Sequence, residues 1–88
     1  MDKSFIRALK ARAHHLNPVI LVGAKGLTEA LLAETNQALI THELIKVKIH
    51  GQEREERASM AQSIAEALDA HLVQLIGTIA IFYRENEE

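Results

Sequence analysis

The chain has 88 residues, of which 48% are hydrophobic and 25% are charged, with a formal net charge of −2 and no cysteine. This length fits one domain with one modest core, and the composition is that of a folded globular protein. The lack of cysteine excludes disulfides, a thiolate nucleophile and cysteine zinc sites. No hydrophobic run reaches membrane-spanning length, so we expect one domain over residues 1–88, located in the cytoplasm and without a membrane partner.

The charge is distributed unevenly along the chain. Residues 1–26 carry five Lys or Arg and one acidic residue, a net charge of +4, so residues 27–88 carry the remaining −6. No acidic residue lies between Asp2 and Glu29. This asymmetry is compatible with a basic face on an otherwise acidic protein.

The first half of the chain predicts a helix, a strand and a second helix. Apolar residues at three- and four-residue spacing predict a helix over residues 4–15, with Ser4 as its N-cap and Pro18 beyond its end. The aliphatic run at residues 19–22 predicts a strand buried on both faces. After a glycine-containing turn, we expect a helix over residues 27–41.

The second half predicts a strand, a helix and a β-hairpin. Residues 44–50 alternate strictly between aliphatic and polar, which is typical of a half-buried strand. A helix is expected over residues 53–69. Two further strands, at residues 71–76 and 78–84, flank Gly77 and form the hairpin.

These elements predict an α/β fold with the order α-β-α-β-α-β-β. The two strand–helix–strand units should place both connecting helices on one face of a four-stranded mixed sheet. The last strand is apolar on both sides. The additional N-terminal helix, or a partner protein, is therefore expected to cover part of the second face.

The sharpest local motif is the segment Gly23, Ala24, Lys25 and Gly26 between a predicted strand and a predicted helix. Two glycines three residues apart permit positive φ and close approach of another backbone. The start of the following helix offers free amides and the positive end of its dipole, and Lys25 adds a cation. This combination is suited to gripping a phosphodiester, as GxxG loops of KH domains do. For a lone four-residue pattern, a sharp turn that merely needs glycine is the better explanation.

A cationic stripe follows the predicted N-terminal helix. Spacings of four, three and four residues place four side chains on one helix face: Lys3, Arg7, Lys10 and His14. Arg12 and His15 flank this stripe, and Lys46 and Lys48 on the polar face of the middle strand could extend it. A solvated helix face is the alternative. Arg57 has acidic neighbours and is expected to be a paired surface charge.

The sequence offers no sign of catalysis. No serine stands in a nucleophile elbow, and the five histidines lack metal-ligand spacing, so we expect no catalytic residue, no metal and no cofactor. The chain has two phenylalanines, one tyrosine and no tryptophan, which leaves no stacking platform for splayed bases. A nucleic-acid ligand would therefore be held by its backbone and shape.

From residue 6 to residue 84 the chain resembles the bacterial YhbY family of single CRM domains (chloroplast RNA splicing and ribosome maturation). The resemblance is carried by residues 9–10, 14, 16, 18–19, 23–28, 38–39, 42–48, 76–77 and 83–84. It implies a fold similar to the C-terminal domain of translation initiation factor three, and a link to precursors of the large ribosomal subunit. It also implies that residues 23–26 are the RNA-contacting loop, with the basic N-terminal helix beside it.

The function expected from the sequence is therefore RNA binding. The chain would be a monomeric, non-enzymatic protein that associates with RNA of the large-subunit precursor particle and assists ribosome assembly. The alternative is a protein–protein adaptor on the assembling ribosome without direct RNA contact, which the acidic net charge and the doubly apolar last strand favour. A positive patch that joins Lys25 to Arg7 and Lys10 would favour RNA, and dispersed cations would favour the adaptor.

Overall fold

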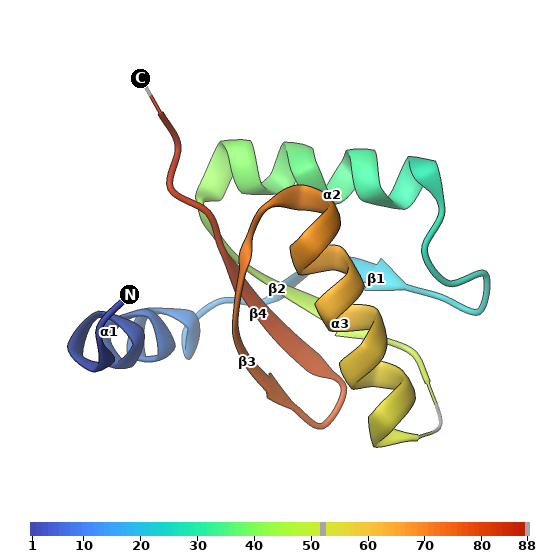
Figure 1. The fold of residues 1–88 in the computed structure, drawn as a ribbon, viewed down its shortest axis with the longest axis horizontal. Helices are drawn as coiled ribbons and strands as arrows, with labels where there is room; N and C mark the ends of the chain where they lie inside the picture. The colour runs from blue at the N-terminus through green and yellow to red at the C-terminus, as the bar shows by residue number, and fades with distance from the viewer. Residues whose placement is uncertain (52, 88) are drawn as a thin grey trace.

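The computed structural model describes residues 1–51 and 53–87. Within this part of the chain, three helices and four strands follow one another in the predicted order (Figure 1). Their bounds are α1 Lys3–Ala13, β1 Pro18–Val22, α2 Glu29–His42, β2 Leu44–Ile49, α3 Arg54–Leu68, β3 His71–Ile76 and β4 Ile79–Tyr83. The α/β class predicted from the sequence is confirmed.

The strands form one mixed sheet with the order β1-β2-β4-β3. β1 and β2 are parallel, and β4 lies antiparallel to both β2 and β3. The last strand in the sequence is thus central in the sheet, which explains why it is apolar on both sides. The hairpin between β3 and β4 turns at Gly77, whose φ of +58° favours glycine.

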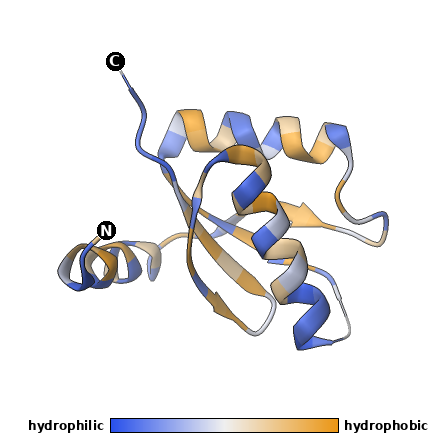
Figure 2. Ribbon diagram, viewed as in Figure 1, coloured by the Kyte–Doolittle hydropathy of each residue, from blue (hydrophilic) through white to orange (hydrophobic). Residues whose placement is uncertain are grey.

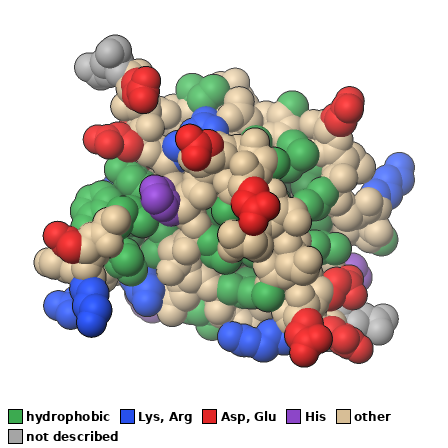
Figure 3. Space-filling view, in the orientation of Figure 1, with side chains coloured by type: hydrophobic (Ala, Val, Ile, Leu, Met, Phe, Trp, Pro, Cys, Tyr) green, Lys and Arg blue, Asp and Glu red, His purple; other side chains and the backbone are tan. Residues whose placement is uncertain are grey.

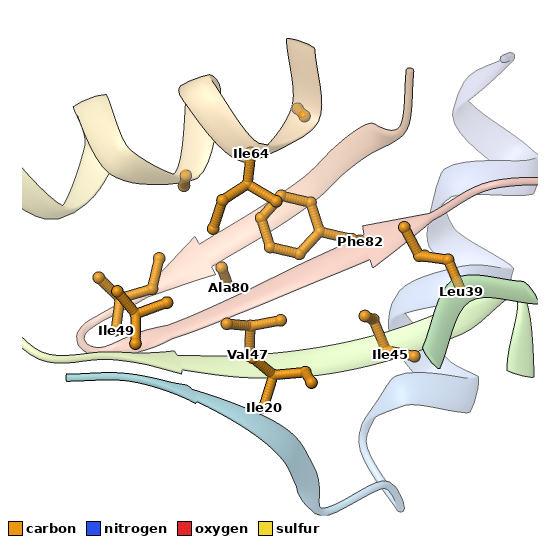
Figure 4. Packing of buried hydrophobic residues seen from close by; sticks show 11 residues of the cluster. Ile20, Leu39, Ile45, Val47, Ile49, Ile64, Ala80 and Phe82 are labelled. Carbon is orange, nitrogen blue, oxygen red and sulfur yellow. The ribbon is translucent and has the colours of Figure 1, made fainter. Parts of the chain in front are cut away.

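One face of the sheet is closed by α2 and α3. Because side chains alternate along a strand, Ile45, Val47 and Ile49 of β2 all point to this face. They pack with Ile64 of α3 and with Phe82 of β4, which is fully buried (Figure 4). Figure 2 shows the hydrophobic residues concentrated along the strands and on parts of the helices, whereas the first turns of α3 are hydrophilic.

The N-terminal helix α1 packs on the opposite face of the sheet, as expected. Its buried residues Leu9 and Ala13 form a second cluster with Leu44 of β2 and Ile81 of β4. Its contacts are with β2, β3 and β4. This helix begins earlier than predicted. The N-cap is Asp2 and not Ser4, because the backbone at Asp2 is extended and its Oδ1 accepts a hydrogen bond of 2.8 Å from the amide of Phe5.

Tyr83, the last residue of β4, contacts α1. Its ring meets that of Phe5 edge to face, with 5.5 Å between the ring centroids. Burial raises the pKa of the Tyr83 phenol above its ordinary value of 10.0, the carboxylates of Glu85 and Glu43 raise it further, and Arg12 lowers it. The phenol therefore stays protonated at neutral pH.

The expectation that the first strand is buried on both faces is wrong. β1 is an edge strand in which Ile20 and Val22 face the core, while Val19 and Leu21 are 50% and 61% exposed. The second face is open here because α1 lies over the other three strands. A continuous aliphatic run cannot distinguish a strand covered on two sides from one covered on a single side.

Two arginines are used to hold the fold together. Arg57, expected among paired surface charges, instead donates hydrogen bonds to the backbone carbonyls of Gly51 (2.8 Å) and Gly77 (2.9 Å). Arg84 donates from Nη1 to Asn36 Oδ1 and to the carbonyl of Leu68, both at 2.8 Å. These bonds tie loops and helix ends to one another, so both cations are committed to structure.

Candidate nucleic-acid interface

Residues 23–26 form a tight turn directly after β1. The amide of Gly26 donates a hydrogen bond of 3.0 Å to the carbonyl of Gly23, and Gly26 has a φ of +71°. Ala24 and Lys25 at the tip are exposed. Glycine is thus required at position 26 by the backbone conformation, since L side chains rarely adopt this region. The loop predicted as the contact point is open to solvent.

Gly23 differs from Gly26 in that the fold gives no reason for glycine there. Its φ is not positive, and a Cβ atom added at this position would meet no atom within 4 Å. Because Gly23 has no side chain, its backbone is not shielded at this point. A ligand such as a phosphodiester can therefore approach the backbone closely, as it does at glycine-rich loops.

The surroundings of the loop come from distant parts of the sequence. Gly23 and Ala24 line a shallow cavity of about 300 Å³ together with His50, Glu56 and Met60, among others. The amide of His50 donates to the carbonyl of Val22, which fixes the end of β2 next to the loop. The described lining includes one acid, Glu56. No local signal in the sequence predicts that Glu56 and Met60 lie here, because the fold alone brings α3 to the loop.

The helix that follows the loop begins later than predicted. α2 starts at Glu29, and Thr28 is its N-cap, with Oγ1 accepting a hydrogen bond of 3.1 Å from the amide of Leu31. The chain itself therefore satisfies one first-turn amide, and Glu29 places a carboxylate at the positive end of the helix dipole. The helix thus starts two residues later than the expected residue 27. Because Thr28 occupies the amide of Leu31, that amide is not free for a ligand at the loop.

The Lys and Arg residues of α1 and its C-cap His14 are all exposed. The residues of α1 are Lys3, Arg7, Lys10 and Arg12. Lys10 and His14 line a cavity of about 200 Å³ between α1 and the sheet, where they meet Lys46 of β2. The structure thus brings part of the predicted stripe together with one of the two predicted strand lysines.

Lys46 and Lys48 lie on the face of the sheet that α1 covers only in part. Their side chains point away from the core formed by Val47, since neighbours on a strand alternate. In the register of the sheet, Lys46 lies opposite Pro18 and Lys48 lies opposite Leu21. Lys48 is exposed and pairs with Leu21, which lies two residues before Gly23. These two lysines therefore occupy the sheet surface between α1 and the loop.

The expectation that the basic helix lies beside the loop is wrong. α1 and the loop between β1 and α2 lie at opposite ends of the molecule, whose longest dimension is 33 Å (Figure 1). In Figure 3, Lys and Arg side chains gather over α1 and appear again over that loop, with acidic side chains over the start of α3. The cations therefore do not form the single patch joining Lys25 to Arg7 and Lys10, and this dispersed arrangement is the one expected to favour the adaptor alternative. They are spread from α1, over Lys46 and Lys48 on the sheet face opposite α2 and α3, to Lys25 in the loop, which borders α3.

The described residues contain neither a cluster typical of a metal site nor a membrane span. Across residues 1–51 and 53–87, no group of three or more His, Asp or Glu side chains is placed to hold a metal ion. The rings of His14 and His15 meet edge to face with their centroids 5.5 Å apart. None of the helices in this part of the chain has the length and apolar character needed to cross a bilayer.

Comparison with known proteins places the chain in a family. A relative in Haemophilus influenzae named "RNA-binding protein" is 50% identical over 80 residues, which cover 91% of this chain and 81% of the relative. A relative in Pseudomonas aeruginosa, named as a probable RNA-binding protein, is 44% identical over 91% of this chain and 77% of its own length. None of these names refers to a catalytic activity.

The fold has a counterpart among solved structures. The solution structure of a hypothetical protein from Staphylococcus aureus, described as a candidate RNA-binding protein, superposes with a TM-score of 0.87 at 30% identity. The match covers 100% of this chain and 92% of that protein. The model of the CRS1 / YhbY (CRM) domain matches residues 1–84. The chain therefore belongs to the CRS1 / YhbY (CRM) domain family.

Proposed function

We propose that this protein binds RNA, and that its target is RNA in the precursor of the large ribosomal subunit, whose assembly it assists. The observation that carries the proposal is Gly23, a half-buried glycine beside open space that neither the backbone conformation nor the packing requires. Its neighbour Lys25 is exposed at the tip of the same turn. Together they offer bare backbone and a cation to a phosphodiester.

Membership of the CRM family supports RNA as the ligand, because the relatives of this chain are named for RNA binding. The ribosomal target follows from the resemblance to the YhbY family, and a cytoplasmic, monomeric protein goes with it. The binding surface would run from the loop at residues 23–26, over Lys48 and Lys46, to Lys10 and Arg7 of α1. A surface of this kind holds the backbone and shape of folded RNA and needs no catalytic group.

The net charge of −2 does not oppose this proposal, because the acids are concentrated elsewhere. Acidic side chains gather over the start of α3 (Figure 3). Several others lie in the C-terminal segment after β4. Glu56 borders the proposed surface, since it lines the cavity beside the loop.

The test is a titration of the purified protein against a fragment of large-subunit ribosomal RNA at several salt concentrations. We expect the logarithm of the association constant to fall by about 0.7–0.9 per phosphate contacted for each decade of salt. Replacing Lys25 and Gly26 together by alanine should weaken binding by about tenfold or more, roughly 1.4 kcal/mol or more. Arg54→Ala, which removes an exposed cation at the start of α3, is the matched control and should leave the affinity unchanged.

The ribosomal part of the proposal needs its own measurement. Sedimentation of the protein with subunits from growing cells should place it with particles that precede the mature large subunit. Association with the small subunit only, or with neither, would contradict that part while leaving RNA binding intact. The adaptor alternative is favoured by the exposed side chains of Val19, Leu21 and Ile76. It predicts that the protein sediments with such particles but binds no purified RNA.

A further inference from the structure

A cavity at the end of α1 lies outside the proposed binding surface. Its volume is about 480 Å³, compared with about 300 Å³ beside the loop and about 200 Å³ between α1 and the sheet. It lies where the chain passes from α1 into β1, next to the start of β2. β1 runs from this cavity to the loop at residues 23–26.

One part of its lining is polar and carries charge of a single sign. Arg12 and His15 at the end of α1, Asn17 before β1, and His42 at the end of α2 contribute to this part. Among the described residues that line the cavity, none is acidic. The nearby carboxylate of Glu43 accepts a hydrogen bond of 2.8 Å from the amide of Asn86, so it is bound to the C-terminal segment. The polar part therefore suits an anion.

The other part of the lining is aliphatic. It consists of Leu16, Val19, Leu44 and Ile45. Leu16 is 37% exposed and Val19 is 50% exposed, so apolar surface remains open to solvent beside Arg12. A ligand that fits both parts carries a flat, weakly polar group and a negative charge close together. A nucleotide has this combination in its base and its phosphate.

We propose that this cavity binds a single unpaired nucleotide of the RNA, with the base against the aliphatic residues and the phosphate toward Arg12. Asn17, His15 and His42 offer hydrogen-bonding groups to the edge of the base. This inference rests on the proposed function and deepens it, because it names a bulged or looped nucleotide as the feature recognised. A base within an A-form helix stays stacked and cannot enter such a cavity.

The placement of the cavity relative to the loop supports one ligand that contacts both. β1 has five residues, so at about 3.3 Å per residue the two sites are roughly 17 Å apart. The surface between them carries the exposed Leu21 and the lysines Lys46 and Lys48 of the neighbouring strand. A few nucleotides of one RNA strand can follow this path, with the backbone held at the loop and one base held in the cavity.

The experiment compares two RNA hairpins that differ only in one bulged nucleotide. We expect the wild-type protein to bind the bulged hairpin about tenfold more tightly than the fully paired one. Leu16→Asp and Val19→Asp each place an anion on the aliphatic surface and should abolish this preference. Ile40→Asp is the matched control, because Ile40 is 48% exposed on α2 and lies outside the cavity. It should retain the preference.

Two substitutions are used because Val19 lies in a strand and its replacement could unfold the protein, whereas Leu16 lies between elements. The preference is a ratio of two affinities, so a uniform loss of affinity caused by the added negative charge cancels. Methyl signals of Leu16, Val19 and Leu44, followed by NMR, report directly on occupancy. They should shift with the bulged hairpin and stay in place with the paired one.

The outcomes separate this inference from the proposed function. Equal affinity for both hairpins with unmoved methyl signals would overturn the nucleotide site and leave RNA binding standing. Binding to neither hairpin would overturn both. A hexaglutamate peptide serves as a competing anion of another class. Methyl shifts caused by that peptide and not by the bulged hairpin would mean that the cavity receives a protein segment, which also overturns the inference.

Discussion

The two faces of the sheet differ in burial and in the residues that they carry, although the same strands form both. The face under α2 and α3 is closed and aliphatic, with Val47 and Phe82 fully buried. The face under α1 is half open, and it carries Lys46 and Lys48 on the same strand as Val47. Packing decides the residues on the first face. On the second face, the half-buried Lys46 and the exposed Lys48 lie beside aliphatic residues, which is what a binding surface requires and a core does not.

A substitution on the closed face should have the largest effect on stability. Phe82→Ala removes a fully buried aromatic ring from the main cluster and should reduce the free energy of unfolding by ~3–5 kcal/mol. Ile76→Ala, at a position that is 57% exposed on the other side of the hairpin, should change it by less than about 0.5 kcal/mol. Urea denaturation followed by circular dichroism measures both. Equal losses would mean that the half-open face is part of the core.

Reversing charge on the open face should spare the fold and reduce RNA affinity. We expect the double change Lys46→Glu and Lys48→Glu to weaken binding of the ribosomal RNA fragment by about a hundredfold, ~2.7 kcal/mol. The slope of affinity against salt should fall by about one for each phosphate that the variant no longer binds. Arg54→Glu reverses one charge at an exposed position on α3, which is half the change in net charge of the double variant, and is the control. If this control weakens binding by about tenfold, half the effect in free energy, net charge and not position determines affinity.

A third change should move stability and binding in opposite directions. Gly23→Ala introduces a methyl group into open space at a residue whose φ is not positive. It should therefore stabilise the fold by about 0.4–1 kcal/mol, because it restricts the unfolded chain. It should also weaken RNA binding by about tenfold, since the methyl group keeps the phosphodiester away from the backbone. Unchanged affinity would show that the ligand does not approach Gly23.

The smallest effect is expected at the start of α1. Asp2→Ala removes the N-cap bond to the amide of Phe5 and should reduce the free energy of unfolding by about 1 kcal/mol. Ser4→Ala should have no effect of this size, because Asp2 is the capping residue. Thermal denaturation distinguishes the two variants. A loss at Ser4 and none at Asp2 would reverse the assignment of the cap.

Much of the fold can be predicted from the sequence, because its strongest signals are local. The alternation along residues 44–49 and the turn at Gly77 depend on neighbours only, and both predictions are confirmed. The exposed face of β1 is not predictable in this way, since cover on a second face depends on where α1 packs. The N-cap is ambiguous between Ser4 and Asp2 because both residue types are good caps, and the choice is set by backbone conformation at Asp2.

The local elements of the candidate site can be predicted from the sequence, but their positions relative to one another cannot. The turn at residues 23–26 follows from two glycines between a strand and a helix. The distance between this loop and α1 does not follow from any spacing, because it depends on the length and direction of β1 within the sheet. Likewise, the cavity that joins Arg12 to His42 unites residues thirty positions apart. Only the packed structure brings such groups together.

The most direct test of the central claim is an NMR titration of the full chain with the ribosomal RNA fragment, followed through the backbone amides. We expect the amides of residues 23–26, Lys46 and Lys48 to shift, while those on the outer surface of α2 stay in place. The opposite pattern, in which RNA binds but shifts only α2 or the C-terminal segment, would contradict it. So would a complete absence of shifts at saturating RNA.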